Sequence, residues 1–113
     1  MLLDLRRIDP RTYAIARCGD TSKLYEELMW FATADDRLLG MILRDKMDAD
    51  YSWLVFARSR QNQYRAIDLG VSAANLAIAE RKLADALERW NAADDATLAA
   101  QTEPRGSGFE RLQ

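Results

Sequence analysis

Residues 72–90 carry the pattern that most constrains the fold of this 113-residue chain. Apolar residues recur there at intervals of three and four, which places them along one side of an α-helix. They are Leu76, Ala79, Leu83, Ala86, Leu87 and Trp90. Charged residues fill the other side, and Asp85 and Arg89 form a favourable pair one turn apart. The pattern predicts one long amphipathic helix whose apolar side lies against an apolar sheet face.

The ends of this helix are predicted from small and polar residues beside it. We expect Gly70 to break the preceding strand and Ser72 to cap the helix, with Asn75 in its first turn. Two alternatives remain at the C-terminal end. The helix stops near Asp94 and Asp95, or it continues to Ala100.

Four shorter segments have the length of β-strands. Each is a short apolar or aromatic run bounded by polar residues: 28–33, 38–43, 51–57 and 64–69. Residues 22–33 could instead begin as a helix, but we favour a strand ending in a hairpin. The short connections imply antiparallel neighbours, because a parallel pair needs a crossover of about a dozen residues. We therefore predict an α+β domain: an antiparallel three- to four-stranded meander sheet packed against one long C-terminal helix.

The two ends of the chain are predicted to be less regular. Asp9 is a good helix N-cap and a proline follows it, which predicts a short N-terminal helix ending at Gly19. Residues 13–16 could equally be extended. The final residues are rich in proline and glycine, so we expect one domain over residues 1–101 and a flexible tail over 102–113.

The composition excludes several kinds of chemistry. The chain has no histidine and one cysteine, which removes histidine-assisted nucleophilic catalysis and cysteine-rich or histidine zinc sites. The five glycines form no phosphate-binding loop. We predict a protein that is not an enzyme and needs no cofactor. Cys18 is expected to be a small, at least half-buried residue without a disulfide partner.

Charge and hydropathy indicate the compartment. The net charge is −2 and the pI about 5.1, which argues against a general affinity for nucleic acid. No apolar run reaches the roughly 18 to 20 residues of a membrane helix, and the N-terminus carries charge where a signal peptide is apolar. We expect a cytoplasmic protein that does not contact membranes.

The first candidate site is acidic. It consists of Asp45, Asp48 and Asp50, joined by Asp35 and Asp36. Such carboxylates could hold Mg²⁺ or Ca²⁺, but the segment lacks the glycine and glutamate of a calcium-binding loop. A solvated hairpin loop explains them more simply. As a functional site, they would form an acidic edge that meets the basic surface of a partner protein.

The second candidate site is basic. Arg58, Arg60 and Arg65 are grouped in one hairpin with Tyr64. Arginines beside an aromatic ring on a sheet can grip phosphates and stack on bases, so this group is the alternative, a nucleic-acid contact. Charged residues that protect exposed strands from aggregation explain the same pattern.

The aromatic residues of the strands form the third group. Trp30, Phe31, Trp53 and Phe56 are expected mainly in the core under the helix. A sheet has a second face, and one helix cannot cover both. Unless the N-terminal segment covers that face, exposed aromatics there would mark a homodimer or partner interface.

Residues 30–40, 45–50 and 64–68 resemble a family of small uncharacterised proteins carried by proteobacterial plasmids, phages and integrative elements. The resemblance spans roughly residues 24–88. It implies an accessory role in a mobile element and transfers no functional residue. In size, acidity and lack of cofactors the chain is similar in kind to anti-CRISPR and other anti-defence inhibitors. The resulting hypothesis is an interaction module that binds a protein or nucleoprotein complex.

Overall fold

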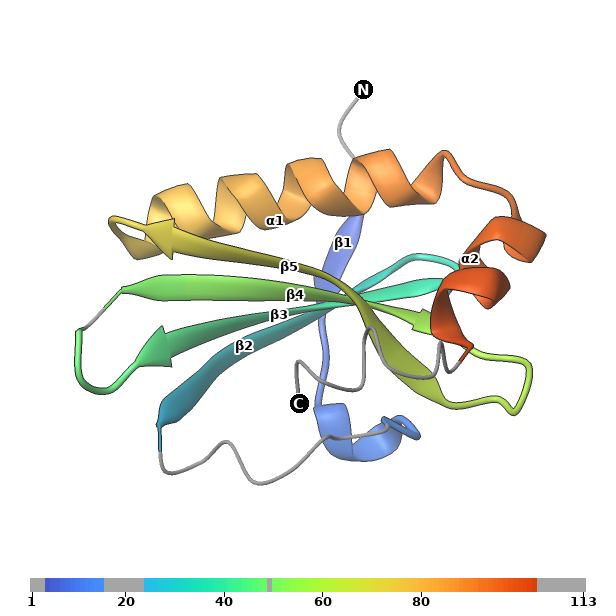
Figure 1. The fold of residues 1–113 in the computed structure, drawn as a ribbon, viewed down its shortest axis with the longest axis horizontal. Helices are drawn as coiled ribbons and strands as arrows, with labels where there is room; N and C mark the ends of the chain where they lie inside the picture. Colours follow the sequence, from blue (N-terminus) through green and yellow to red (C-terminus); the bar gives the residue numbers. More distant parts are fainter. Residues whose placement is uncertain (1–3, 16–23, 49, 104–113) are drawn as a thin grey trace.

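The computed structural model describes residues 4–15, 24–48 and 50–103, apart from the side chains of residues 71 and 72. Within these ranges the elements follow one another along the chain in the order shown in Figure 1. They are β1 (Leu5–Arg7), the 3₁₀ turn η1 (Pro10–Thr12), β2 (Tyr25–Thr33), β3 (Leu38–Asp45), β4 (Tyr51–Arg58), β5 (Tyr64–Ala73), α1 (Leu76–Asn91) and α2 (Asp95–Thr102).

The sheet is an antiparallel meander, as predicted. Its strands lie in chain order, β1-β2-β3-β4-β5, and every neighbouring pair is antiparallel. The α+β class is confirmed, but the predicted number of strands was too low: the described residues form a five-stranded sheet rather than one of three or four strands. The missed strand is β1, whose three residues are too few to show an alternating pattern.

The predicted start of the long helix was wrong. Strand β5 continues through Gly70 to Ala73, so Ser72 lies within a strand rather than at the start of the helix. The cap is Asn75, whose side chain accepts a hydrogen bond from the N–H of Ile78 at 2.9 Å. Gly70 does not break the strand because the indole of Trp53 lies over it; a Cβ there would be 1.8 Å from that ring.

The single long helix is in fact two helices. Helix α1 ends at Asn91, and Asp94 caps α2 by accepting a hydrogen bond from the N–H of Thr97 at 2.7 Å. The alternative that stopped the helix near Asp94 is therefore the observed one. Thr102, where the flexible tail was expected to begin, is the buried last residue of α2; residues 104–113 lie outside the described ranges.

The N-terminal helix is also shorter than predicted. Asp9 does cap it, accepting a hydrogen bond from the N–H of Arg11 at 3.0 Å, but only the turn η1 follows. The chain then extends and Ile15 forms a parallel bridge with Tyr64. The expected stop at Gly19 and the expectation for Cys18 fall outside the described residues.

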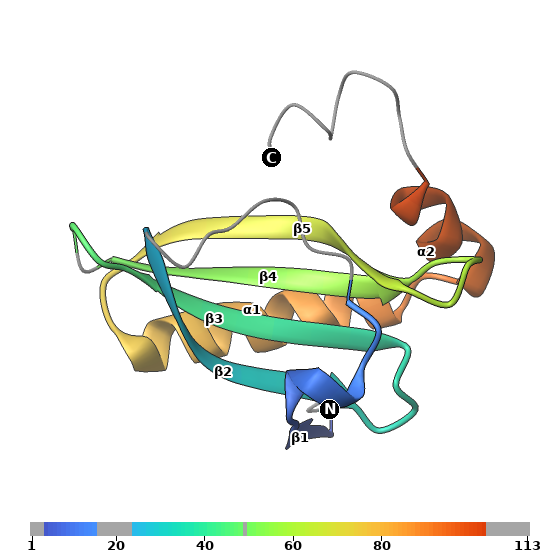
Figure 2. The same ribbon diagram turned by 90° about the horizontal axis from the view of Figure 1, so that it is seen from below.

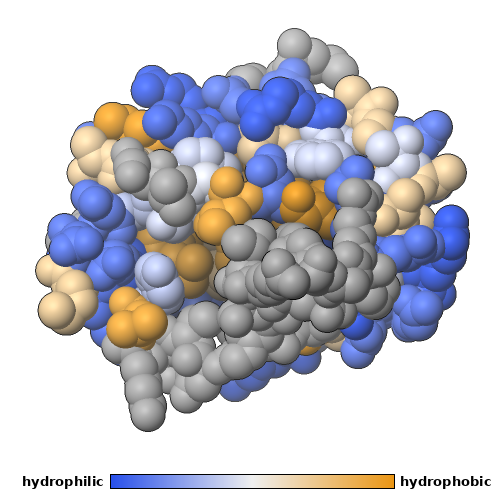
Figure 3. Space-filling model, viewed as in Figure 1, coloured by the Kyte–Doolittle hydropathy of each residue, from blue (hydrophilic) through white to orange (hydrophobic). Residues whose placement is uncertain are grey.

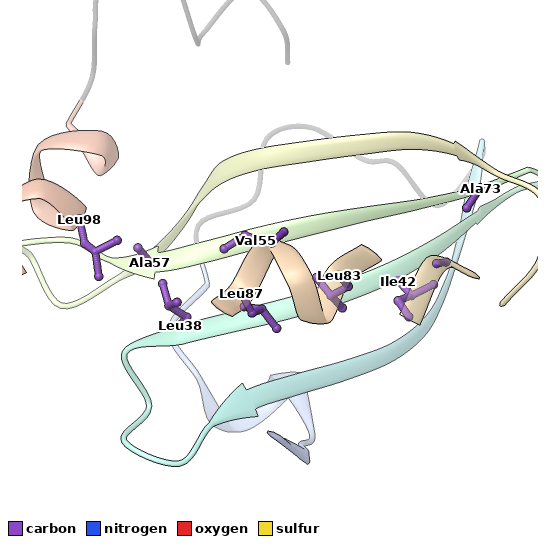
Figure 4. Close-up of a cluster of buried hydrophobic side chains, with 10 residues drawn as sticks. Leu38, Ile42, Val55, Ala57, Ala73, Leu83, Leu87 and Leu98 are labelled. Atoms are coloured by element: carbon purple, nitrogen blue, oxygen red, sulfur yellow. The ribbon is translucent and has the colours of Figure 1, made fainter. Parts of the chain in front are cut away.

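Both helices pack on one face of the sheet, which we call the helix face (Figures 1 and 2). Leucines of α1 point toward aliphatic residues of β3 and β4 (Figure 4). Gly40 lets the helix approach closely, since a Cβ there would be 2.9 Å from a Leu83 methyl group. The buried members of this core are Leu38, Ile42, Val55, Ala57, Ala73, Ala79, Leu83, Ala86, Leu87 and Leu98.

A second apolar core lies on the opposite face, which we call the strap face. Its buried members are Trp30, Ala32, Leu39, Met41, Leu43, Phe56 and Tyr64. The prediction that Trp30 and Phe56 lie under the helix was therefore wrong. Their rings contact each other on the strap face, with centroids 5.2 Å apart. Because side chains alternate along a strand, Phe31 points to the helix face instead.

The strap face is named after the N-terminal segment that crosses it. Strand β1 lies at one edge of the sheet, whereas Ile15 lies beside β5 at the other. Residues 8–15, the strap, connect these edges, and Figure 2 shows this blue segment rising from β1 toward β5. Ile8, Tyr13 and Ile15 pack against the second core. The N-terminal segment thus contributes cover to the face that the helices leave bare.

Candidate functional site

The five aspartates of the predicted acidic site lie at opposite ends of the sheet. Asp35 and Asp36 belong to the turn between β2 and β3, whereas Asp45, Asp48 and Asp50 belong to the end of β3 and the turn that follows. The eight residues of β3 separate the two turns by roughly 25 Å. One binding surface cannot use all five.

Asp36 is part of a polar cluster that ties the β2–β3 turn to the N-terminal segment. Its carboxylate accepts hydrogen bonds from Arg6 and from the Tyr13 hydroxyl, the latter at 3.1 Å. Its backbone carbonyl accepts one from the Tyr64 hydroxyl at 2.6 Å. We call Arg6, Tyr13, Asp36 and Tyr64 the latch. These contacts hold Asp36 at a φ of 60°, a left-handed conformation that aspartate tolerates.

Two members of the latch have shifted pKa values. The hydrogen bond with Asp36 raises the pKa of Arg6, and the bond with Tyr13 adds to the shift. Burial raises the pKa of Tyr64. Both groups therefore hold their usual protonation state at neutral pH, as a structural contact requires, and neither is tuned for proton transfer.

Asp35 is used within its own turn. It accepts hydrogen bonds from the Thr33 hydroxyl at 2.8 Å and from the N–H of Arg37 at 3.2 Å. Partial burial alone would raise the pKa of this carboxyl, but the two hydrogen bonds together with the charge of Arg37 lower it overall. Asp35 thus stabilises the turn in its charged form.

The β3–β4 turn has a different character. Asp45 orders it by accepting hydrogen bonds from the N–H groups of Met47, at 2.7 Å, and Asp48, at 3.1 Å. Met47 itself is 83% exposed, and Asp48 and Asp50 are exposed beside it. The adjacent end of the sheet adds Leu24, 58% exposed, whose carbonyl accepts a hydrogen bond from the N–H of Lys46 at 3.0 Å.

This end of the molecule combines exposed apolar side chains with exposed carboxylates. We call it the acidic tip, and it consists of Leu24, Lys46, Met47, Asp48 and Asp50. Another exposed large apolar residue, Leu69 on β5, is 57% exposed and lies apart from the tip on the strap face. In Figure 3 hydrophilic residues (blue) predominate along the upper side of this view, where α1 runs, and several hydrophobic residues (orange) lie below them.

The predicted basic site is not a single patch. Arg58 is paired across the strands with Tyr64, a buried residue of the strap face. Arg65 is paired with Ala57 of the helix-face core, and paired residues share a face. Arg60 forms an ion pair with Glu103. Tyr64 is 5% exposed, so its ring cannot stack on a base.

Arg37, which no sequence pattern indicated, connects the two helices to the β2–β3 turn. Its guanidinium donates to the Asp95 carboxylate at 2.9 Å and to the backbone carbonyls of Asn91, at 3.0 Å, and Ala93, at 2.6 Å. These carbonyls lie at the end of α1 and just beyond it, where helix hydrogen bonding stops. The partners are 54 to 58 residues away, so no local pattern could have indicated them.

Other kinds of site find little support in the described ranges. There, no group of three histidine, cysteine, aspartate or glutamate residues is placed to hold a metal ion. A shallow depression on the outer side of α1 is lined by the charged residues Asp85, Glu88 and Arg89. None of the helices in these ranges combines the length and hydropathy that a membrane span needs.

Comparison with known proteins gives no match. No protein-family model matches the chain, and the searches of curated proteins and of solved structures gave no match either.

Proposed function

We propose that this protein is a non-enzymatic interaction module that docks on a partner protein through the acidic tip. The proposal rests on the exposure of Met47. This large apolar side chain is 83% exposed on a turn that Asp45 orders. An exposed apolar centre with a polar rim is the usual anatomy of a protein interface. Methionine adapts its shape to the partner surface.

The charge of the tip indicates the chemistry of the partner. Asp48 and Asp50 are exposed beside Met47, whereas Asp45 is committed to the turn. Such carboxylates favour a basic surface by complementary charge, which speeds association and selects the partner. The partner would therefore present lysine or arginine around an apolar pocket that receives Met47.

The biological setting in this proposal rests on the sequence resemblance. We place the protein among the accessory proteins of mobile elements, as an inhibitor that binds a host defence complex, such as an anti-CRISPR protein. The basic channels of nucleoprotein machines offer the positive surface that the acidic tip would seek.

The proposal is tested by capture from a bacterial lysate with matched variants. A partner bound by the wild-type protein should be lost with Met47→Ser, and Asp48→Asn with Asp50→Asn together should weaken binding about tenfold or more. Glu88→Gln is the control, because it removes an exposed carboxylate on α1, away from the tip.

Retention of the partner by a variant that combines Met47→Ser, Asp48→Asn and Asp50→Asn would overturn the proposal. The nucleic-acid alternative predicts something else: salt-dependent binding to DNA or RNA that Arg58→Ala and Arg60→Ala abolish. The separation of Arg58, Arg60 and Arg65 over two faces and an ion pair gives that alternative no support.

A further inference from the structure

The strap is joined to the rest of the sheet by few contacts. At one edge the N–H of Ile8 donates to the carbonyl of Trp30 at 3.0 Å, and at the other the N–H of Tyr64 donates to the carbonyl of Ala14 at 2.7 Å. Between these bonds no strap residue is buried; Ile8, Pro10, Tyr13 and Ile15 are half-buried and the rest are exposed.

The core beneath the strap is, in contrast, well buried. Trp30 is 5% exposed and Phe56 is 4% exposed. These residues also pack against their own neighbours in the sheet, within the β2–β3 and β3–β4 ladders. A segment that makes few buried contacts with a well-packed core can open locally while the rest of the protein stays folded.

The latch adds side-chain contacts near the C-terminal end of this segment. Tyr13 is the strap residue in it: its hydroxyl accepts a hydrogen bond from Arg6 at 2.9 Å and donates one to Asp36 at 3.1 Å. Its ring meets that of Tyr64 edge-on, with centroids 5.6 Å apart. The hydrogen bond from Arg6 is exposed, so water competes with it, and the bond to Asp36 is only partly buried.

We propose that the strap opens as one unit while the sheet and both helices remain folded, and that the latch sets how often it opens. Opening removes Ile8, Tyr13 and Ile15 from the core around Trp30 and frees the edge of β5 at Tyr64. The device is separate from the acidic tip, so it stands or falls independently of the proposed docking.

Hydrogen exchange of backbone amides in the full chain tests this proposal. The amides of Ile8 and Tyr64 report on the strap, because each makes a hydrogen bond that closes it. They lie at opposite edges of the sheet, yet one opening event should give both the same opening constant, at least tenfold larger than that of amides in β3 and β4. Their exchange should also depend only weakly on added urea, since opening exposes little surface.

Two variants separate strap opening from global unfolding. Ile42→Val trims the helix-face core and should speed exchange in β3 and β4 about twofold to tenfold, while Ile8 and Tyr64 do not change. Tyr13→Phe removes the latch hydroxyl and should speed the strap amides about twofold to tenfold. Amides that exchange only by global unfolding should be accelerated by the same factor. The variant destabilises the closed state, and both strap opening and global unfolding start from that state.

Two results would overturn the proposal. One is acceleration of the Ile8 and Tyr64 amides by Ile42→Val to the same extent as the amides of β3 and β4. The other is a different response of the two strap amides to Tyr13→Phe, which would mean that the edges open separately.

Discussion

The two faces of the sheet are covered in different ways. On the helix face, α1 contributes Ala79, Leu83, Ala86 and Leu87, each at most 1% exposed. On the strap face, the covering segment contributes no buried residue of its own. The same sheet therefore supports a regular layer on one side and a lightly held segment on the other.

This difference follows from the geometry of the two covers. A helix presents a side chain to the sheet every three or four residues, so one apolar stripe buries many side chains together. The strap crosses the strands only once and packs on them through a few half-buried side chains. We infer that the helix face supplies most of the stability and that motion is concentrated on the strap face.

The largest expected effect compares one residue from each cover. Leu87→Ala, at a residue that is 0% exposed, should lower the free energy of unfolding by about 2–5 kcal/mol. Ile15→Ala, at a half-buried strap residue, should cost about 1 kcal/mol. Urea denaturation of both variants measures the difference. Equal losses would show that the strap carries as much of the fold as the helix.

A second comparison concerns two glycines within the helix-face layer. Gly70→Ala should cost about 1–3 kcal/mol, because the added carbon would lie 1.8 Å from the Trp53 ring. Gly40→Ala is the matched comparison and should cost less than Gly70→Ala, since its Cβ would meet methyl groups of Leu83 and Leu87 at 2.9–3.0 Å rather than an aromatic ring at 1.8 Å. Thermal unfolding would rank the two variants.

The role of the indole can be isolated in the same experiment. Trp53→Leu should make Gly70→Ala less harmful than it is in the wild-type background, because the clash disappears with the ring. Additive losses would mean that Gly70 is needed for another reason, such as the backbone of β5.

The parts of the fold that sequence predicted are those with a local period. The α1 stripe and strands β2 to β5 follow from spacing within a few residues. The start of α1 was misplaced because Gly70 was taken as a strand breaker, although in the structure Trp53 of the neighbouring strand covers it. That cover comes from 17 positions earlier in the chain, beyond any local pattern.

The site was harder to predict than the fold, for the same reason. Asp36 and Asp48 look alike in sequence, but Asp36 is bound by Arg6 and Tyr13 from the N-terminal segment, whereas Asp48 is exposed. Only the tertiary arrangement separates a structural carboxylate from an available one. Arg37, whose partners are at the ends of the helices, was missed because its contacts are equally distant in sequence.

The smallest expected effect compares the N-cap aspartates of the two covers, Asp94 of α2 and Asp9 of the strap turn η1. Hydrogen bonds from the side chain and N–H of Thr97 lower the pKa of Asp94, and the Arg11 side chain and N–H lower that of Asp9, both from 3.8 in the unfolded chain. A carboxyl with a lowered pKa stabilises the fold fully above 3.8, and this contribution is lost as the pH falls through the folded value.

Asparagine keeps the cap but does not titrate, so Asp94→Asn should be less stable than the wild type near neutral pH, with the gap closing as the pH falls below 3.8. Asp9→Asn should behave alike in urea denaturation, but only this variant should also speed exchange at Ile8 and Tyr64, because Asp9 lies in the strap. A gap that stays constant with pH would mean that neither cap prefers its charged form. Faster strap exchange in Asp94→Asn would mean that the two covers are coupled, since a cap in the helix layer would then govern the opening of the opposite face.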